Sequence, residues 1–115
     1  MDRLLLQRHA ELCQTLASPV RLEILGLLRD GEQRVGELAA QTGLNQSNIS
    51  QHLTVLRHKG IVATRREGTN VFYCIANPKI IQACDLIREV LAEQASQHAQ
   101  LARAARHAPL RRKTA

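Results

Sequence analysis

The chain has 115 residues, enough for one small domain, although a domain of this size is often completed by dimerisation. Its formal net charge of +6 favours an acidic partner, and with Phe72 and Tyr73 as the only aromatic residues it lacks the stacking platforms that read single-stranded nucleic acid. Three cysteines without Cys-x-x-Cys spacing do not form a disulfide framework, and no apolar run approaches the roughly 18 residues of a membrane span, so we expect a cytoplasmic protein that makes no membrane contact.

Two helices are predicted in the first thirty residues. Apolar residues between Asp2 and Ala17 fit one broad helical face, with polar residues on the remainder. Ser18 then supplies an N-cap and Pro19 the first position of a second helix, which ends before Gly31. The predicted buried stripe of this second helix is Val20, Ile24, Leu27 and Leu28, and Leu22 and Leu25 widen it.

A helix-turn-helix unit is predicted next. Val35 to Thr42 forms a short helix whose Leu38 and Ala39 face inward. Gly43 supplies a sharp turn, and Asn45 caps the following helix. Helix, glycine turn and helix is the arrangement of the bihelical DNA-binding unit.

The helix after Asn45 has an apolar stripe and an opposing polar face. At about 100° per residue Ile49, Leu53 and Leu56 lie within roughly 40° of one another, so they face a core. The opposing face carries amides, hydroxyls and imidazoles but no carboxylate, which suits base edges in the DNA major groove, whereas an ordinary solvated face usually contains glutamate. The residues predicted to contact DNA here are Gln46, Ser47, Asn48, Ser50, Gln51, His52, Arg57, His58 and Lys59.

The two histidines of this segment have different expected roles. His58 lies on the solvent side with Arg57 and Lys59, which favours a phosphate contact. His52 lies nearer the flank of the helix, where a structural hydrogen bond is an equal alternative to a DNA contact.

After Gly60 the apolar period changes from about 3.6 residues to 2, which predicts a β-hairpin. Its strands are Ile61–Arg66 and Val71–Ile75, joined by a turn at residues 67–70. The basic and polar tip is typical of a wing that lies along a phosphate backbone, with Arg65, Arg66 and Asn70 as the contacting residues. A surface hairpin without a ligand is the alternative.

Asn77-Pro78 opens a last helix whose apolar surface exceeds what one small domain can cover. We therefore expect a homodimer, formed by the first and last helices through Leu5, Leu12, Leu16, Ile80, Cys84, Ile87 and Leu91. The predicted DNA-binding and dimerisation domain covers residues 1–96. Residues 97–115 hold Arg103, Arg106, Arg111, Arg112 and Lys113 without an acid, which leaves about +1 for the rest and predicts a frayed or disordered basic tail.

With this order of elements the chain resembles the ArsR/SmtB family of dimeric winged helix-turn-helix repressors. The resemblance spans Leu12 to about Glu93, and its motifs are LASPVRLEILGLL, VGELAAQTGLNQSNISQHLTVLRHKGIV and RREGTNVFYCI. It implies a mainly α fold with a small β-hairpin in the order α-α-α-α-β-β-α. It also implies repression through a palindromic operator in double-stranded DNA, with release by a ligand or a redox signal.

Two metal sites that the resemblance implies lack their ligands in this chain. The third-helix thiolates of the arsenic, lead and cadmium sensors fall at Arg34 and Gly36. The ligands of the zinc sensors fall at Asn77, Lys79, Val90 and Glu93, of which only the glutamate can bind zinc. Because zinc needs about four ligands, we expect no metal at either place and no cofactor.

A different thiol site is conceivable. His9 and Cys13 lie four residues apart on the first helix and share a face, and Cys84 could meet them across the dimer as a metalloid or persulfide sensor. Family members that sense sulfide or oxidants pair a second-helix cysteine with a last-helix one, and residues 20–29 contain no cysteine. The alternative is that Cys13 and Cys84 are small buried apolar residues, the usual state of free cysteine.

The sequence contains no motif that places a nucleophile beside a base and no glycine-rich phosphate loop, so we do not expect an enzyme. The leading hypothesis is a sequence-specific, dimeric transcriptional repressor. The alternative is a helical adaptor whose basic face meets an acidic protein. The sequence leaves the inducer unknown.

Overall fold

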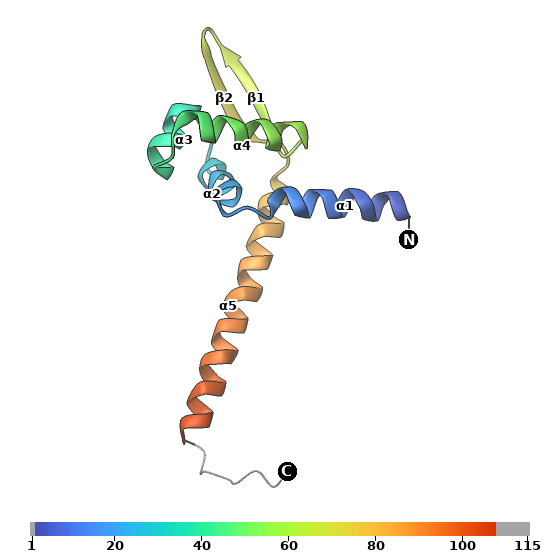
Figure 1. Cartoon of the computed structure of the whole chain (residues 1–115), viewed down its shortest axis with the longest axis vertical. Coiled ribbons are helices and arrows are strands. Elements are labelled where there is room, and N and C mark those ends of the chain that lie inside the picture. Colours follow the sequence, from blue (N-terminus) through green and yellow to red (C-terminus); the bar gives the residue numbers. More distant parts are fainter. Residues whose placement is uncertain (1, 108–115) are drawn as a thin grey trace. The chain divides into compact units, whose positions relative to one another are not determined.

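The computed structural model describes residues 2–107, which form five helices and one two-stranded sheet (Figure 1). The chain divides into two compact units, one up to Ile81 and one from Gln82. In chain order the elements are α1 (Arg3–Leu16), α2 (Pro19–Leu28), α3 (Val35–Thr42), α4 (Gln46–His58), β1 (Val62–Glu67), β2 (Asn70–Ile75) and α5 (Pro78–His107). This confirms the predicted order of elements.

The capping residues predicted for α2 are in place. The Ser18 hydroxyl accepts a hydrogen bond from the backbone N–H of Arg21 at 3.3 Å, and Pro19 occupies the first turn. The buried stripe differs from the prediction, because Leu25 is fully buried with Ile24 and Leu28 while Val20 and Leu27 are only partly buried. Since α2 contacts α3, α4 and β2, it is covered over a broader arc than a single stripe.

The helix-turn-helix unit has the predicted boundaries. Gly43 follows α3 with φ of +74°, the left-handed conformation that glycine adopts without strain, and its N–H donates to the carbonyl of Ala39. The Asn45 side chain accepts a hydrogen bond from the Asn48 N–H at 2.7 Å and caps α4. The core of the first unit therefore combines α2, α3, α4 and β1 through Ile24, Leu25, Leu28, Leu38, Ala39, Ile49, Leu53, Leu56, Ile61 and Val62.

Both strands of the hairpin reach one residue further into the predicted turn, and β1 begins at Val62, one residue later than predicted. Glu67 pairs with Asn70, so only Gly68 and Thr69 form the turn, and Gly68 has a positive φ of +61°. In the middle of β2, Tyr73 forms an isolated antiparallel bridge to Gln33, with N···O distances of 3.0 and 2.8 Å. These two hydrogen bonds join β2 to the loop between α2 and α3.

α5 has 30 residues and remains helical past Ser96 to His107. Residues 108–115 of the predicted basic tail lie outside the described residues. No helix in the described part of the chain has the length and apolar character needed to cross a membrane.

Candidate nucleic-acid interface

Three residues of α4, Ile49, Leu53 and Leu56, are fully buried and turn one face of the helix toward the core. The opposite face, which consists of polar side chains, therefore points outward. Gln46, Ser47, Asn48, Gln51 and Thr54 are exposed, and Ser50 is half-buried. The Thr54 hydroxyl donates to the Ser50 carbonyl at 2.9 Å, so its proton is already used within the helix. The amides and the Ser47 hydroxyl remain free to meet base edges.

His52 is tied to the interior side of the helix. Its Nδ1 accepts a hydrogen bond from Nε of Arg21 at 3.2 Å, and Nη1 of the same arginine donates to the Thr15 carbonyl at 3.1 Å. Burial, and then the positive charge of Arg21, lower the pKa of His52, which favours the neutral imidazole. Of the two roles expected for His52, the structure shows the structural hydrogen bond. Through its two hydrogen bonds, Arg21 of α2 links α4 to α1.

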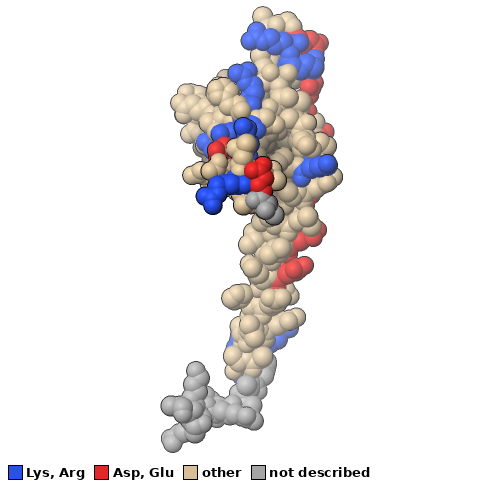
Figure 2. All heavy atoms as spheres, turned by 90° about the vertical axis from the view of Figure 1, so that its right-hand side faces the viewer, with Lys and Arg blue, Asp and Glu red and all other residues tan. Residues whose placement is uncertain are grey.

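The hairpin carries acidic as well as basic side chains, and Figure 2 shows Lys and Arg atoms beside Asp and Glu atoms at its end of the molecule. The guanidinium of Arg65 is bonded by Glu32 and Glu67 and lies over the ring of Phe72, whereas Arg66 forms no ion pair or hydrogen bond among the side chains described. Asn70 is exposed at the start of β2, next to the turn. The two arginines predicted to act alike therefore have different surroundings.

The ion pairs shift the titration of the groups involved. The hydrogen bonds that Arg65 donates lower the pKa of Glu32, and the acceptance of these bonds by Glu32 and then by Glu67 raises the pKa of Arg65. Glu32 is not predicted as a site residue from the sequence, because it lies 33 residues before Arg65 and outside the hairpin. Strand alternation alone could have placed Glu67 on the same face as Arg65.

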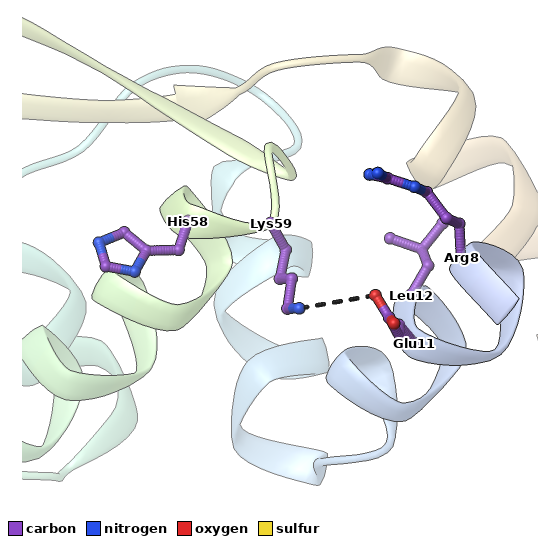
Figure 3. Close-up of a pocket in the computed structure, with 5 residues that line it drawn as sticks. All are labelled: Arg8, Glu11, Leu12, His58 and Lys59. Carbon is purple, nitrogen blue, oxygen red and sulfur yellow. Dashed lines mark ion pairs between the residues drawn. The ribbon is translucent and has the colours of Figure 1, made fainter. Parts of the chain in front are cut away.

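Arg57, His58 and Lys59 end α4 and are all exposed. A pocket of about 330 Å³ lies between this end of α4 and α1, lined by Arg8, Glu11, Leu12, His58 and Lys59 (Figure 3). Lys59 points toward Glu11, with 3.9 Å between Nζ and Oε2, while the His58 ring is turned away from that carboxylate. Because both partners of this ion pair are about half exposed, it holds Lys59 only weakly.

The predicted thiol site is divided between the two units. Cys13 is exposed on α1, so its expected burial is wrong for the single chain, and the neighbouring His9 is exposed as well. Cys84 on α5 is buried as expected, and Cys74 on β2 is half-buried. Within residues 2–107 no group of three or more His, Cys, Asp or Glu is placed to hold a metal ion. A pairing across two chains stays a prediction.

The residues predicted for the dimer interface divide into two groups. Leu5 on α1 is 60% exposed, and Ile87 and Leu91 on α5 are 60% and 58% exposed. Leu12, Leu16 and Ile80 instead pack partly against the core, and Cys84 is buried. Further large apolar side chains that are exposed on the same two helices are Leu4, Leu6, Leu86, Val90 and Leu101.

Comparisons with known proteins identify relatives of this chain. Residues 18–64 match the model of the arsR family of bacterial regulatory proteins. The chain is 48% identical over 84 residues to the HTH-type transcriptional regulator Rv0081 of Mycobacterium tuberculosis, covering 72% of this chain and 74% of the relative. It is 41% identical over 88 residues to the biofilm growth-associated repressor of Xylella fastidiosa, covering 76% and 77%.

Solved structures of similar proteins share the fold of this chain. The crystal structure of M. tuberculosis Rv0081 has a TM-score of 0.77 at 42% identity, covering 86% of this chain and 99% of that one. The homodimeric winged helix-turn-helix DNA-binding domain of Mb0332 from Mycobacterium bovis, solved by NMR, has a TM-score of 0.73 at 38% identity. It covers 81% of this chain and 88% of that one.

Proposed function

This chain belongs to the ArsR family of bacterial regulatory proteins, and we propose that it is a dimeric transcriptional repressor that occupies a palindromic operator in double-stranded DNA. The observation that carries the proposal is the outer face of α4, which presents amides and hydroxyls and no carboxylate. The name of the X. fastidiosa relative supports repression as the direction of regulation.

In this proposal Gln51 and Ser47, one helical turn apart on α4, meet base edges in the major groove. A glutamine amide can pair with N6 and N7 of adenine together, and a serine hydroxyl can bond to most base edges. Gln46, Asn48 and Ser50 lie beside them at the start of the helix. These five residues determine which sequence is bound.

Phosphate contacts flank this reading helix. Arg57, His58 and Lys59 are exposed where α4 ends, and the hairpin adds a positive charge at Arg66. Such contacts fix the position of the protein on the duplex and make binding depend on salt, but they carry no sequence information.

The homodimer is supported by the exposed apolar side chains of α1 and α5, and by the homodimeric state of the Mb0332 domain. Two copies would place their α4 helices in successive major grooves about 34 Å apart, which requires half-sites one helical turn apart. Such a repressor acts where the DNA is, in the bacterial cytoplasm.

Release of the operator by a ligand or a change in thiol redox state belongs to the same proposal. The exposed thiol of Cys13 supports an accessible site on α1, with His9 one turn away on the same helix. In this proposal Cys84 joins the site across the dimer.

The test is a pair of salt titrations, one on an operator selected from a random duplex pool and one on a scrambled duplex. Gln51→Ala should cost about 1–3 kcal/mol on the operator and almost nothing on the scrambled duplex, because it removes base discrimination. The control is Gln100→Ala, which truncates an exposed glutamine of α5 and should change neither affinity. If the unmodified protein binds both duplexes equally, it is not a sequence-specific repressor, and an adaptor with a basic face becomes the better hypothesis.

A further inference from the structure

Two neighbouring arginines of β1 lie on opposite faces of the hairpin, because successive side chains of a strand alternate. Arg65 is opposite Phe72 in the strand register, and its guanidinium carbon lies 4.6 Å from the centre of the Phe72 ring. This cation–π contact holds the side chain flat against the hairpin. Arg66 is opposite Val71 and is exposed.

The donors of Arg65 are used by two carboxylates. Its Nε donates to Oε2 of Glu32 at 3.1 Å, Nη2 donates to the other oxygen of Glu32, and Nη1 donates to Oε2 of Glu67 at 2.8 Å. Glu32 therefore receives a two-point contact, the geometry in which a guanidinium binds a carboxylate most specifically.

Glu32 does not belong to the hairpin. It precedes Gln33, whose backbone forms the bridge to Tyr73, and both residues lie in the loop between α2 and α3. Since Tyr73 pairs with Thr64, the contact of Arg65 with Glu32 lies one residue closer to the hairpin tip than this bridge. It therefore extends the attachment of the hairpin to the helix-turn-helix.

The local charge also argues against a phosphate at Arg65. One guanidinium between two carboxylates gives this group a net charge of −1, so an approaching phosphate meets repulsion. The phosphate would also have to displace Glu32 and Glu67, which already accept hydrogen bonds from the N–H groups of Arg65. Arg66 has no such partner among residues 2–107. Its positive charge is available at the surface.

We propose that Arg65 is a positioning residue that holds the wing to the helix-turn-helix through Glu32, and that Arg66 supplies the phosphate contact of the wing. The first part concerns the free chain alone. The second part rests on the proposed function, because it needs DNA. The sequence predicts a phosphate contact for both arginines, and this proposal keeps that contact for Arg66 alone.

The first part is tested by hydrogen exchange of the free protein. Arg65→Gln and Glu32→Gln should each speed exchange of the Gln33 and Tyr73 amides roughly two- to fivefold, as expected when an exposed ion-pair network is lost. The double variant should exchange no faster than either single one, because both remove the same contact. Arg66→Gln is the matched control on the same strand and should change nothing. Unaltered exchange in Arg65→Gln and Glu32→Gln would overturn the positioning role.

The second part is tested by the salt dependence of DNA binding. The plot of log K against log salt concentration has a negative slope, and Arg66→Gln should make this slope less steep by about 0.9 for each wing that contacts DNA. Arg65→Gln should leave the slope unchanged and lose affinity by the same factor at every salt concentration. A slope lowered by Arg65→Gln as much as by Arg66→Gln would show that Arg65 neutralises a phosphate. If the unmodified protein binds no duplex, the proposed function fails, while the exchange experiment still decides the role of Arg65.

Discussion

His52 connects the helix that is proposed to read DNA with two other helices through one arginine. Its pKa is lowered from the ordinary value near 6.5, so as the pH falls the unfolded chain takes up this proton before the folded one. The stabilising contribution is therefore complete above about pH 6.5 and is lost as the pH falls through the lower, folded-state pKa. Protonation would also place a positive imidazolium against Arg21 and remove its acceptor.

We predict that the free energy of unfolding decreases below about pH 6.5, and that His52→Gln reduces this decrease, because the glutamine oxygen can still accept from Arg21 without titrating. Urea unfolding at a series of pH values measures the effect. His98→Gln, at an exposed position of α5, is the control and should keep the pH dependence of the unmodified protein. An unchanged pH dependence in His52→Gln would show that another group is responsible.

At single residues, the sequence predicts which side chains are exposed better than it predicts which side chains form hydrogen bonds or ion pairs with one another. The helical period places Gln51 outward and Leu53 inward, and both predictions are confirmed because they depend only on helix geometry. The partners of Arg65 and His52 could not be predicted in this way. Glu32 and Arg21 lie about thirty residues away in sequence and approach only when the whole unit is folded.

At the scale of elements, the turn between α3 and α4 sets the direction of the reading helix, and Gly43 is the residue that permits it. A Cβ at Gly43 would meet no atom within 4 Å, so a substitution there is opposed by backbone conformation alone. We predict that Gly43→Ala destabilises the protein by about 1–2 kcal/mol, and that Gly43→Asn costs less, because asparagine tolerates the left-handed region better.

A second glycine provides the opposite case for the same urea unfolding experiment. Gly36 lies within α3, and a Cβ there would be 3.5 Å from the Gln46 side chain, an ordinary contact. Gly36→Ala should therefore stabilise the protein by up to about 1 kcal/mol. Equal destabilisation by Gly36→Ala and Gly43→Ala would contradict the conformational explanation.

The elements themselves were predicted well where capping and periodicity agree, as in α3 and α4. The hairpin was shortened in the prediction because Glu67 and Asn70 have the polar composition of a turn, yet they pair across the strands. In α2, the sequence predicts a buried stripe that contains Leu27 and is widened by Leu25, yet Leu25 is the fully buried one of the two because the helix has neighbours on several sides. Neighbours of this kind arise from tertiary packing, which local sequence does not reveal.

For the whole molecule, most of the net charge of +6 lies beyond Ser96, whereas the residues proposed for the dimer interface lie before it. Of the five basic residues beyond Ser96, Arg103 and Arg106 lie on the described part of α5, and the other three lie outside the described residues. The Ala- and Arg-rich composition there is compatible with a continuing helix as well as with a frayed one, so sequence alone could not locate its end.

The last prediction concerns the dimer. Leu86, Ile87, Val90 and Leu91 lie within two turns of α5 and are each at least half exposed, as are Leu4 and Leu5 on α1. Exposed apolar side chains gathered in this way on a helix of a small protein mark an interaction site. Placing a charge at a buried position of the interface should be costly, since the carboxylate would lose its hydration without gaining a partner. Ile87→Asp and Leu91→Asp should therefore give monomers at micromolar concentration that bind the selected operator poorly.

Sedimentation velocity distinguishes this effect from a general loss of apolar surface. Leu101→Asp introduces the same charge at a residue that is 68% exposed on the same helix but lies outside the predicted interface, and it should leave the dimer intact. If Leu101→Asp dissociates the protein as fully as Leu91→Asp does, the interface extends further along α5 than Ile87 and Leu91 indicate. If the unmodified protein sediments as a monomer, the two α4 helices are not held one helical turn apart. A palindromic operator with that spacing would then lose its physical basis.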